Sequence, residues 1–160
     1  MTFLVRLAHF LSRRINNIIS LPSESHVWCI PQMVRDVTPE YVEEAMKKTK
    51  LLFVDCWAAW CGPCKALGPI LDELEQKYSN NPNVGFLKVN TDEHQEYAIK
   101  HGIMGIPCVL IFFNGEPAKL KIVNKDTGNT TVHDRLIGLR PAEHFEYVIE
   151  TLLETEGISS

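Results

Sequence analysis

Apolar and polar positions along the first half of the chain follow a helix, strand, helix, strand order. Apolar side chains recur at helical spacing after Thr38-Pro39, where Thr38 suits the cap and Pro39 the first turn. The run 50–58 is nearly all apolar, as in a central strand buried on both faces. Helical spacing returns over 64–78, where Pro69 predicts a kink, and 84–90 reads as a second apolar strand.

The second half of the chain carries shorter elements. We expect a helix at 93–101, strands at 108–113, 119–123 and 131–137, and a closing helix at 141–153. Asn114-Gly115 has preferred hairpin-turn chemistry, and the polar turn 124–130 predicts a hairpin that extends beyond the sheet, between the last two strands. Together the two halves predict an α/β fold with a mixed central β-sheet flanked by helices.

The first residues form a different kind of segment. Over 3–19 one helical stripe is apolar and the opposite face is basic, the stripe being Leu4, Leu7, Leu11, Ile15 and Ile18. No acidic residue precedes Glu24, which is typical of a mitochondrial transit peptide and predicts the matrix as destination. There are two alternatives. The segment is a membrane-surface or signal anchor, or it is an extension without a targeting signal, which would leave the chain in the cytoplasm. We therefore divide the chain into an extension with linker (1–30), a folded domain (31–155) and a frayed end (156–160).

Charge changes this picture in one respect. The net charge is −4, and residues 1–23 hold three arginines and no acid, which leaves 13 of the 16 basic residues with all 20 acidic ones. An acidic body argues against nucleic-acid binding, which needs clustered Lys and Arg. Arg13 and Arg14 interrupt the apolar N-terminal stretch, so we expect no transmembrane span.

The cysteines suggest redox chemistry more than scaffolding. Their number is odd and their spacing uneven, which favours a reducing compartment; they are Cys29, Cys56, Cys61, Cys64 and Cys108. Only one Cys-x-x-Cys pair is present, so a structural zinc site lacks ligands and we predict no metal.

Cys61 and Cys64 stand where a predicted buried strand passes into a predicted helix. A helix start offers unpaired N–H groups and partial positive charge, which stabilise a thiolate on Cys61. Cys64, one turn further, can then attack a mixed disulfide, while Gly62 and Pro63 stiffen the turn between them. Taken alone, the spacing also fits a pair of core cysteines or half of a metal site.

Three separated motifs resemble the thioredoxin family. They are the run 54–65, which contains Trp60-Cys61-Gly62-Pro63-Cys64, then Gly105-Ile106-Pro107, and then Phe113-Asn114-Gly115-Glu116. The similarity spans about 33–153 and implies the thioredoxin fold, a redox disulfide between Cys61 and Cys64, and no bound cofactor. It also implies electrons from NADPH through a thioredoxin reductase, and disulfide-containing protein substrates such as peroxiredoxins.

The resemblance also assigns roles to further residues. Asp55 matches a buried carboxylate that exchanges a proton with the resolving cysteine, and Lys88 matches the lysine near it; burial should raise the pKa of Asp55. The alternative is that the Asp55 side chain only caps a neighbouring backbone group and exchanges no proton. Pro107 matches a cis-proline facing the dithiol. The substrate groove would be bordered by Trp60, Gly62, Pro63, Gly105, Ile106 and Gly138.

Two departures from the family stand out. Cys56 stands where the family often has an aromatic residue, and Cys108 where it often has threonine. We interpret both as small buried side chains. A regulatory or metal-binding role is the alternative for Cys108. The stretch 119–135 is longer than the usual connection and could alter the choice of partner.

The resemblance further implies a general disulfide reductase rather than an oxidase or isomerase, because in the family the more oxidising sites carry His-containing dipeptides in place of Gly-Pro. A reductant dedicated to one target, such as a peroxidase, and a non-catalytic binding module are the competing functions, although the module's expected mark, a lost cysteine, is missing.

Overall fold

A computed structural model describes residues 33–123 and 130–154. The chain divides into two units, Met1–Ile30 and Pro31–Ser160, and the described residues all belong to the second. The expectations for 1–30 and 156–160 therefore fall outside the described residues.

The described unit is built on a mixed sheet of six strands. Its strands are β1 (Arg35–Asp36), β2 (Leu51–Trp57), β3 (Val84–Asn90), β4 (Cys108–Phe113), β5 (Glu116–Pro117) and β8 (Arg135–Ile137). They follow the order β1-β3-β2-β4-β5, with β8 also paired to β4. β2 runs parallel to β3 and antiparallel to β4, which confirms the predicted mixed sheet.

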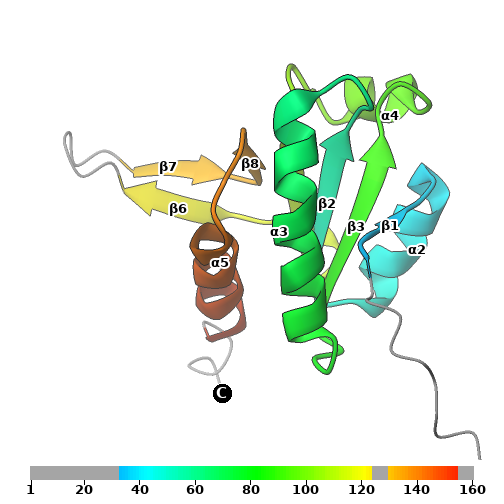
Figure 1. Ribbon diagram of the computed structural model, residues 1–160. Helices are drawn as coiled ribbons and strands as arrows, with labels where there is room; N and C mark the ends of the chain where they lie inside the picture. The colour runs from blue at the N-terminus through cyan, green and yellow to red at the C-terminus, as the bar shows by residue number, and fades with distance from the viewer. Residues whose placement is uncertain (1–32, 124–129, 155–160) are drawn as a thin grey trace, which may run out of the picture. The chain divides into compact units, whose positions relative to one another are not determined.

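Helices cover both faces of this sheet (Figure 1). They are α2 (Pro39–Lys48), α3 (Gly62–Tyr78), α4 (Gln95–Lys100) and α5 (Ala142–Glu154). Leu51 and Phe53 of β2 share one core with α3 and α5. Leu52 and Val54 share the other core with α2 and Tyr97 of α4. Since side chains alternate along a strand, Asp55 lies on the α3 face and Cys56 on the α2 face.

Helix α3 begins two residues before the expected start at Cys64. Cys61 is its N-cap, and Gly62 and Pro63 form its first turn. Proline is tolerated there because its missing N–H would have no partner in the helix, whereas apolar periodicity begins only at Cys64. The predicted stripe is buried at Leu67, Leu71 and Leu74, together with Cys64, whereas Tyr78 at its end is half-buried.

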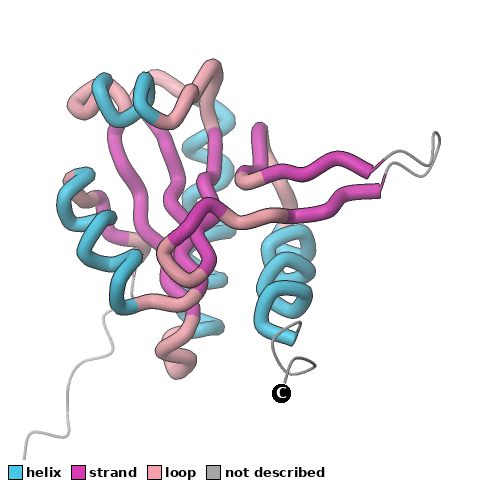
Figure 2. Tube along the Cα trace, turned by 180° about the vertical axis from the view of Figure 1, so that it is seen from behind, coloured by secondary structure: helices cyan, strands magenta, loops and turns pink. Residues whose placement is uncertain are grey.

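The long connection after β5 forms a sheet of its own. β6 (Leu120–Val123) and β7 (Thr130–His133) pair antiparallel, and this two-stranded ribbon projects beside α5, away from the central sheet (Figure 2). The turn between them lies outside the described residues. The expectation of one strand over 131–137 was wrong: the chain leaves the ribbon at Asp134, whose carbonyl accepts from Ile111, and β8 returns to the central sheet.

Burial explains that return. Leu136 of β8 is buried in the core that α3 shares. Because removal of this apolar side chain from water is favourable, it stabilises the pairing of β8 with β4. In the described part of the chain no helix is both long and apolar enough to cross a bilayer.

Candidate active site

Cys61 and Cys64 form a disulfide at the start of α3, with their Cα atoms 5.3 Å apart. The backbone N–H of Cys64 donates to the Cys61 sulfur at 3.2 Å. Both cysteines are almost completely buried. The Cys61 sulfur therefore occupies the position of a helix cap, where N–H groups and the helix dipole favour negative charge.

Asp55 is the buried carboxylate on the same face of the sheet as α3. It is 3% exposed, and its Oδ1 has no hydrogen-bond partner. Loss of water around the carboxylate raises the pKa of Asp55 from 3.8 to about 7, against the opposing effect of the Lys88 cation. The expected upward shift is thus confirmed, and the group can gain or lose a proton near neutral pH.

Lys88 lies directly across from Asp55 in the parallel pair of β2 and β3. Its ammonium nitrogen is 5.2 Å from the centroid of the Trp57 ring, a cation–π distance. On its other side it stands opposite Asp36 of β1, whose charge raises the pKa of Asp55. The sheet register therefore places one cation between two carboxylates.

Trp60 is held beside the disulfide by a residue that the sequence analysis missed. Its ring N–H donates to the two carboxylate oxygens of Asp92 at 2.9 and 3.1 Å, although the side chain is 71% exposed. Asp92 follows β3, and the carboxyl ends of parallel β2 and β3 meet at one edge of the sheet. Polar residues directly after a predicted neighbouring strand were the signal that could have found it.

The Ile106–Pro107 peptide bond is cis, as the resemblance implies. The carbonyl of Pro107 accepts from the N–H of Gly138 at 2.9 Å, so these two predicted residues are brought together. Gly138 has a φ of +79°, a left-handed conformation that glycine adopts without strain. Gly105 and Gly62 are exposed and have open space where a Cβ would stand.

Cys56 and Cys108 face each other across β2 and β4, on the α2 side of the sheet. Both are free and buried, as expected from the sequence. Burial raises the pKa of both thiols. Across the described ranges, no group of three or more metal-binding side chains is assembled.

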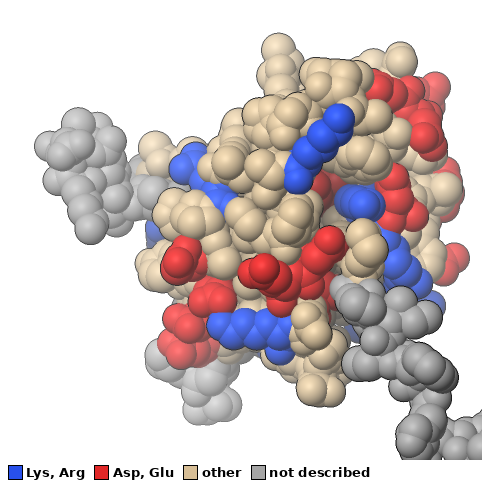
Figure 3. Space-filling view, viewed as in Figure 1, with Lys and Arg blue, Asp and Glu red and all other residues tan. Residues whose placement is uncertain are grey.

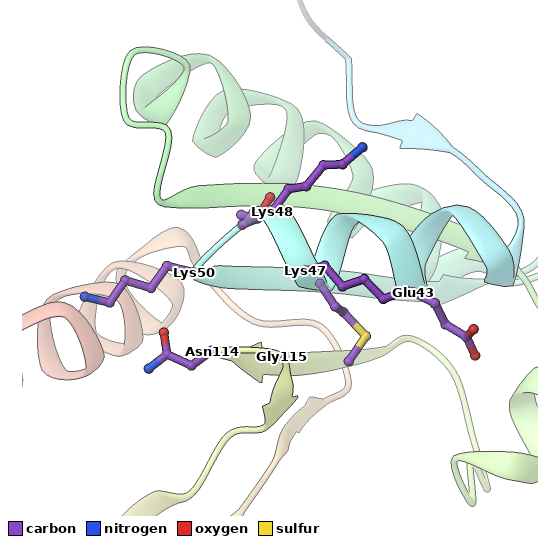
Figure 4. Close-up of a pocket in the computed structure, with 8 residues that line it drawn as sticks. Glu43, Lys47, Lys48, Lys50, Asn114 and Gly115 are labelled. Atoms are coloured by element: carbon purple, nitrogen blue, oxygen red, sulfur yellow. The ribbon is translucent and has the colours of Figure 1, made fainter.

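An open depression of about 920 Å³ lies away from these residues, between the end of α2 and the turn after β4 (Figure 4). No cysteine is among the described residues that line it, and Lys48 and Lys50 point in opposite directions rather than toward one ligand. On the face shown in Figure 3, Lys and Arg lie singly or in short runs among acidic and uncharged side chains.

The sequence matches the family model described as Thioredoxin over residues 25–135. A thioredoxin of Alicyclobacillus acidocaldarius is 32% identical over 118 residues, 74% of this chain and 96% of the relative. One from Staphylococcus saprophyticus is 37% identical over 97 residues, 61% of this chain and 77% of the relative.

Solved structures agree on the fold. The thioredoxin of Malassezia sympodialis has a TM-score of 0.57 at 25% identity, covering 78% of this chain and 96% of that one. Oxidised mitochondrial thioredoxin 3 of Saccharomyces cerevisiae has a TM-score of 0.55 at 23% identity, covering 74% and 94%.

Members of this family normally bind no cofactor and act with reductases and disulfide substrates. Because the matched region exceeds half of the chain and contains the Cys61–Cys64 disulfide, the protein belongs to the thioredoxin family and is a thiol–disulfide oxidoreductase.

Proposed function

We propose that this protein is a general reductase of protein disulfides, recharged by a thioredoxin reductase with electrons from NADPH. The observation that carries the proposal is the position of the Cys61 sulfur at the N-cap of α3, where it accepts the N–H of Cys64. A thiolate formed there is stabilised by that N–H and by the helix dipole.

Cys61 acts as the nucleophile in this proposal. Its thiolate attacks one sulfur of the substrate disulfide, forms a mixed disulfide and expels the other sulfur as a thiolate. Cys64 then loses its proton and attacks the Cys61 sulfur. The substrate leaves as a dithiol. The two electrons that reduce it come from the Cys61 and Cys64 thiols, which are oxidised to a disulfide.

Asp55 takes the proton of Cys64 in the second step. Its carboxylate lies on the α3 face, and its pKa of about 7 lets it accept that proton and return it at neutral pH. Lys88 acts through Asp55, because its charge limits how far burial raises the carboxylate's pKa.

The substrate segment lies along the exposed surface around the disulfide. Trp60, Gly62 and Pro63 border it on one side, and Gly105, Ile106, Pro107 and Gly138 on the other. Extended peptides add to exposed backbone in this way, with main-chain hydrogen bonds supplying affinity. Open space at Gly62 and Gly105 supports this role, since a side chain there would approach the bound peptide.

The trapping of partners tests these roles. In Cys64→Ser, Cys61 still attacks but the mixed disulfide persists, so covalently bound partners should be recovered; Cys61→Ser should recover none and have no turnover. If covalently bound partners were recovered from Cys61→Ser and not from Cys64→Ser, Cys64 would be the nucleophile and Cys61 the resolving cysteine. NADPH-driven reduction of insulin with a thioredoxin reductase tests the whole cycle, and a peroxiredoxin in place of insulin tests that substrate class.

We further propose that residues 1–23 direct the protein to the mitochondrial matrix. The support is the apolar stripe opposite Arg6 and Arg13 and the absence of acids before Glu24. A fluorescent protein fused after residues 1–30 should enter mitochondria. Signal in the cytosol or secretory pathway would contradict the proposal, and retention in carbonate-washed membranes would favour an anchor.

A further inference from the structure

A second concave surface lies between the β6–β7 ribbon, β8 and α5. This ribbon groove has a volume of about 480 Å³. Leu120, Lys121 and His133 of the ribbon line one side, and Tyr147 and Val148 of α5 line the other. Much of the groove is thus built by the stretch 119–135, which is longer than the family's usual connection.

The interior of the ribbon groove is apolar. Leu120, Leu136 and Val148 are buried at its base, while Ile137 and Tyr147 are 60% and 66% exposed. A concave apolar surface of this size with a few polar groups is typical of a binding site.

The charge of the ribbon groove has one sign. None of the described residues that line the groove is Asp or Glu. The lining does include three basic residues, Lys121, Arg135 and Arg140, and two histidines. Arg135 is neutralised, because it forms an ion pair with Asp134 and donates to the carbonyl of His101. Within the described ranges, Lys121 and Arg140 form no ion pair, and Arg140 is steadied by a hydrogen bond to the carbonyl of Ile137.

The groove adjoins the proposed substrate surface along the chain. Ile137 lines it, and the next residue, Gly138, is tied to the carbonyl of Pro107. A protein lying across Gly138 would therefore reach the ribbon groove with neighbouring residues.

We propose that the ribbon groove is a second docking site for protein substrates and takes an acidic segment that carries apolar side chains. The apolar side chains cover Ile137 and Tyr147, and the carboxylates face Lys121 and Arg140. The claim that this segment belongs to a disulfide substrate rests on the proposed function. The binding of the segment itself does not, so the two can fail separately.

A cysteine-free peptide of Glu, Leu and Phe, labelled with a fluorophore, tests the groove directly by anisotropy on the full chain. Reversing both cations, in Lys121→Glu/Arg140→Glu, should weaken binding roughly tenfold at low salt. Tyr147→Ala, at an exposed position, should weaken it severalfold. The matched control is Lys47→Glu/Lys48→Glu on α2, which changes the net charge equally and should leave affinity unchanged.

Substrate kinetics test the link to catalysis. A peptide disulfide extended by the acidic segment should be reduced with a lower KM than one extended by Ser and Gly, and the difference should vanish in Lys121→Glu/Arg140→Glu while kcat remains. The proposal would be overturned if the two peptide disulfides had equal KM values. It would also be overturned if Lys47→Glu/Lys48→Glu weakened peptide binding equally, or if dodecanoate bound more tightly than the peptide. Retained peptide binding in a protein that cannot reduce insulin would instead overturn the proposed function alone.

Discussion

Burial of the Asp55 carboxylate couples the stability of the protein to pH. Its pKa is about 7 in the folded protein against an ordinary value of 3.8. Between these values the folded state keeps a proton that the unfolded state releases. Stability therefore falls as pH rises from about 4 to 7, and the loss from this one group approaches about 4 kcal/mol above pH 8.

Asp55→Asn removes that dependence because an amide does not ionise. Its free energy of unfolding, measured with denaturant, should match that of the wild type near pH 4 and exceed it by up to about 4 kcal/mol at pH 8. Glu73→Gln, at an exposed position on α3, serves as control and should show no such trend. A difference between Asp55→Asn and wild type that does not vary with pH would contradict the burial argument.

The two free thiols of the described residues, Cys56 and Cys108, should be nearly inert in the folded protein. Burial raises the pKa of Cys56 and Cys108, and only a thiolate reacts with iodoacetamide. In the reduced protein carrying Cys29→Ser, both should be alkylated more than about a hundredfold more slowly than Cys61. Mass spectrometry of timed samples measures this, with urea-unfolded protein as control. Alkylation of Cys108 as fast as Cys61 would disprove it.

At the scale of elements, sequence patterns predicted the long helices and central strands but not the short pairings. The stripe through Leu67, Leu71 and Leu74 identified α3, and the apolar run identified β2, because each carries many buried side chains. β1 has two residues, both exposed, and is held by backbone pairing with β3, so no pattern marks it. Backbone pairing likewise separates β7 from β8 within the stretch 131–137, which the sequence predicts as one strand.

The site was predictable to the same degree. The dithiol and its helix follow from spacing, and burial of Asp55 follows from its place in an apolar strand. The cis bond at Pro107 and the proximity of Gly138 came only from the family resemblance, since cis is the minority form of such bonds. Asp92 was missed because its role depends on two parallel strands ending at the same edge.

Shortening the ribbon should leave the catalytic elements intact. Replacing 122–131 with Asn-Gly keeps the Lys121–Val132 pair and closes it with a preferred two-residue turn. Because β8 pairs with β4 independently of the ribbon, reduction of a small aromatic disulfide should stay within about twofold of wild type. Loss of this activity with the circular dichroism spectrum retained would show that the ribbon contributes to the site.

At the scale of the whole molecule, the first unit should be dispensable for chemistry. The disulfide, Asp55, Lys88 and the Gly138 segment all belong to Pro31–Ser160. Deleting 2–30 should therefore leave insulin reduction within about twofold and the unfolding midpoint within a few degrees. The full-length protein is the control. A large drop in either would mean that the first thirty residues stabilise the folded domain.

The central sheet also acts as a barrier between two pools of sulfur. Cys61 and Cys64 stand at the start of α3, while Cys56 and Cys108 face the α2 side, with strand backbone between the two layers. A mixed disulfide on Cys61 has two fates: correct release by Cys64, or capture by another thiol into a dead-end pairing. Among the described residues, Cys64 is the thiol on the same layer as Cys61, so the sheet keeps Cys56 and Cys108 from capturing the intermediate and directs each turnover toward release of the substrate.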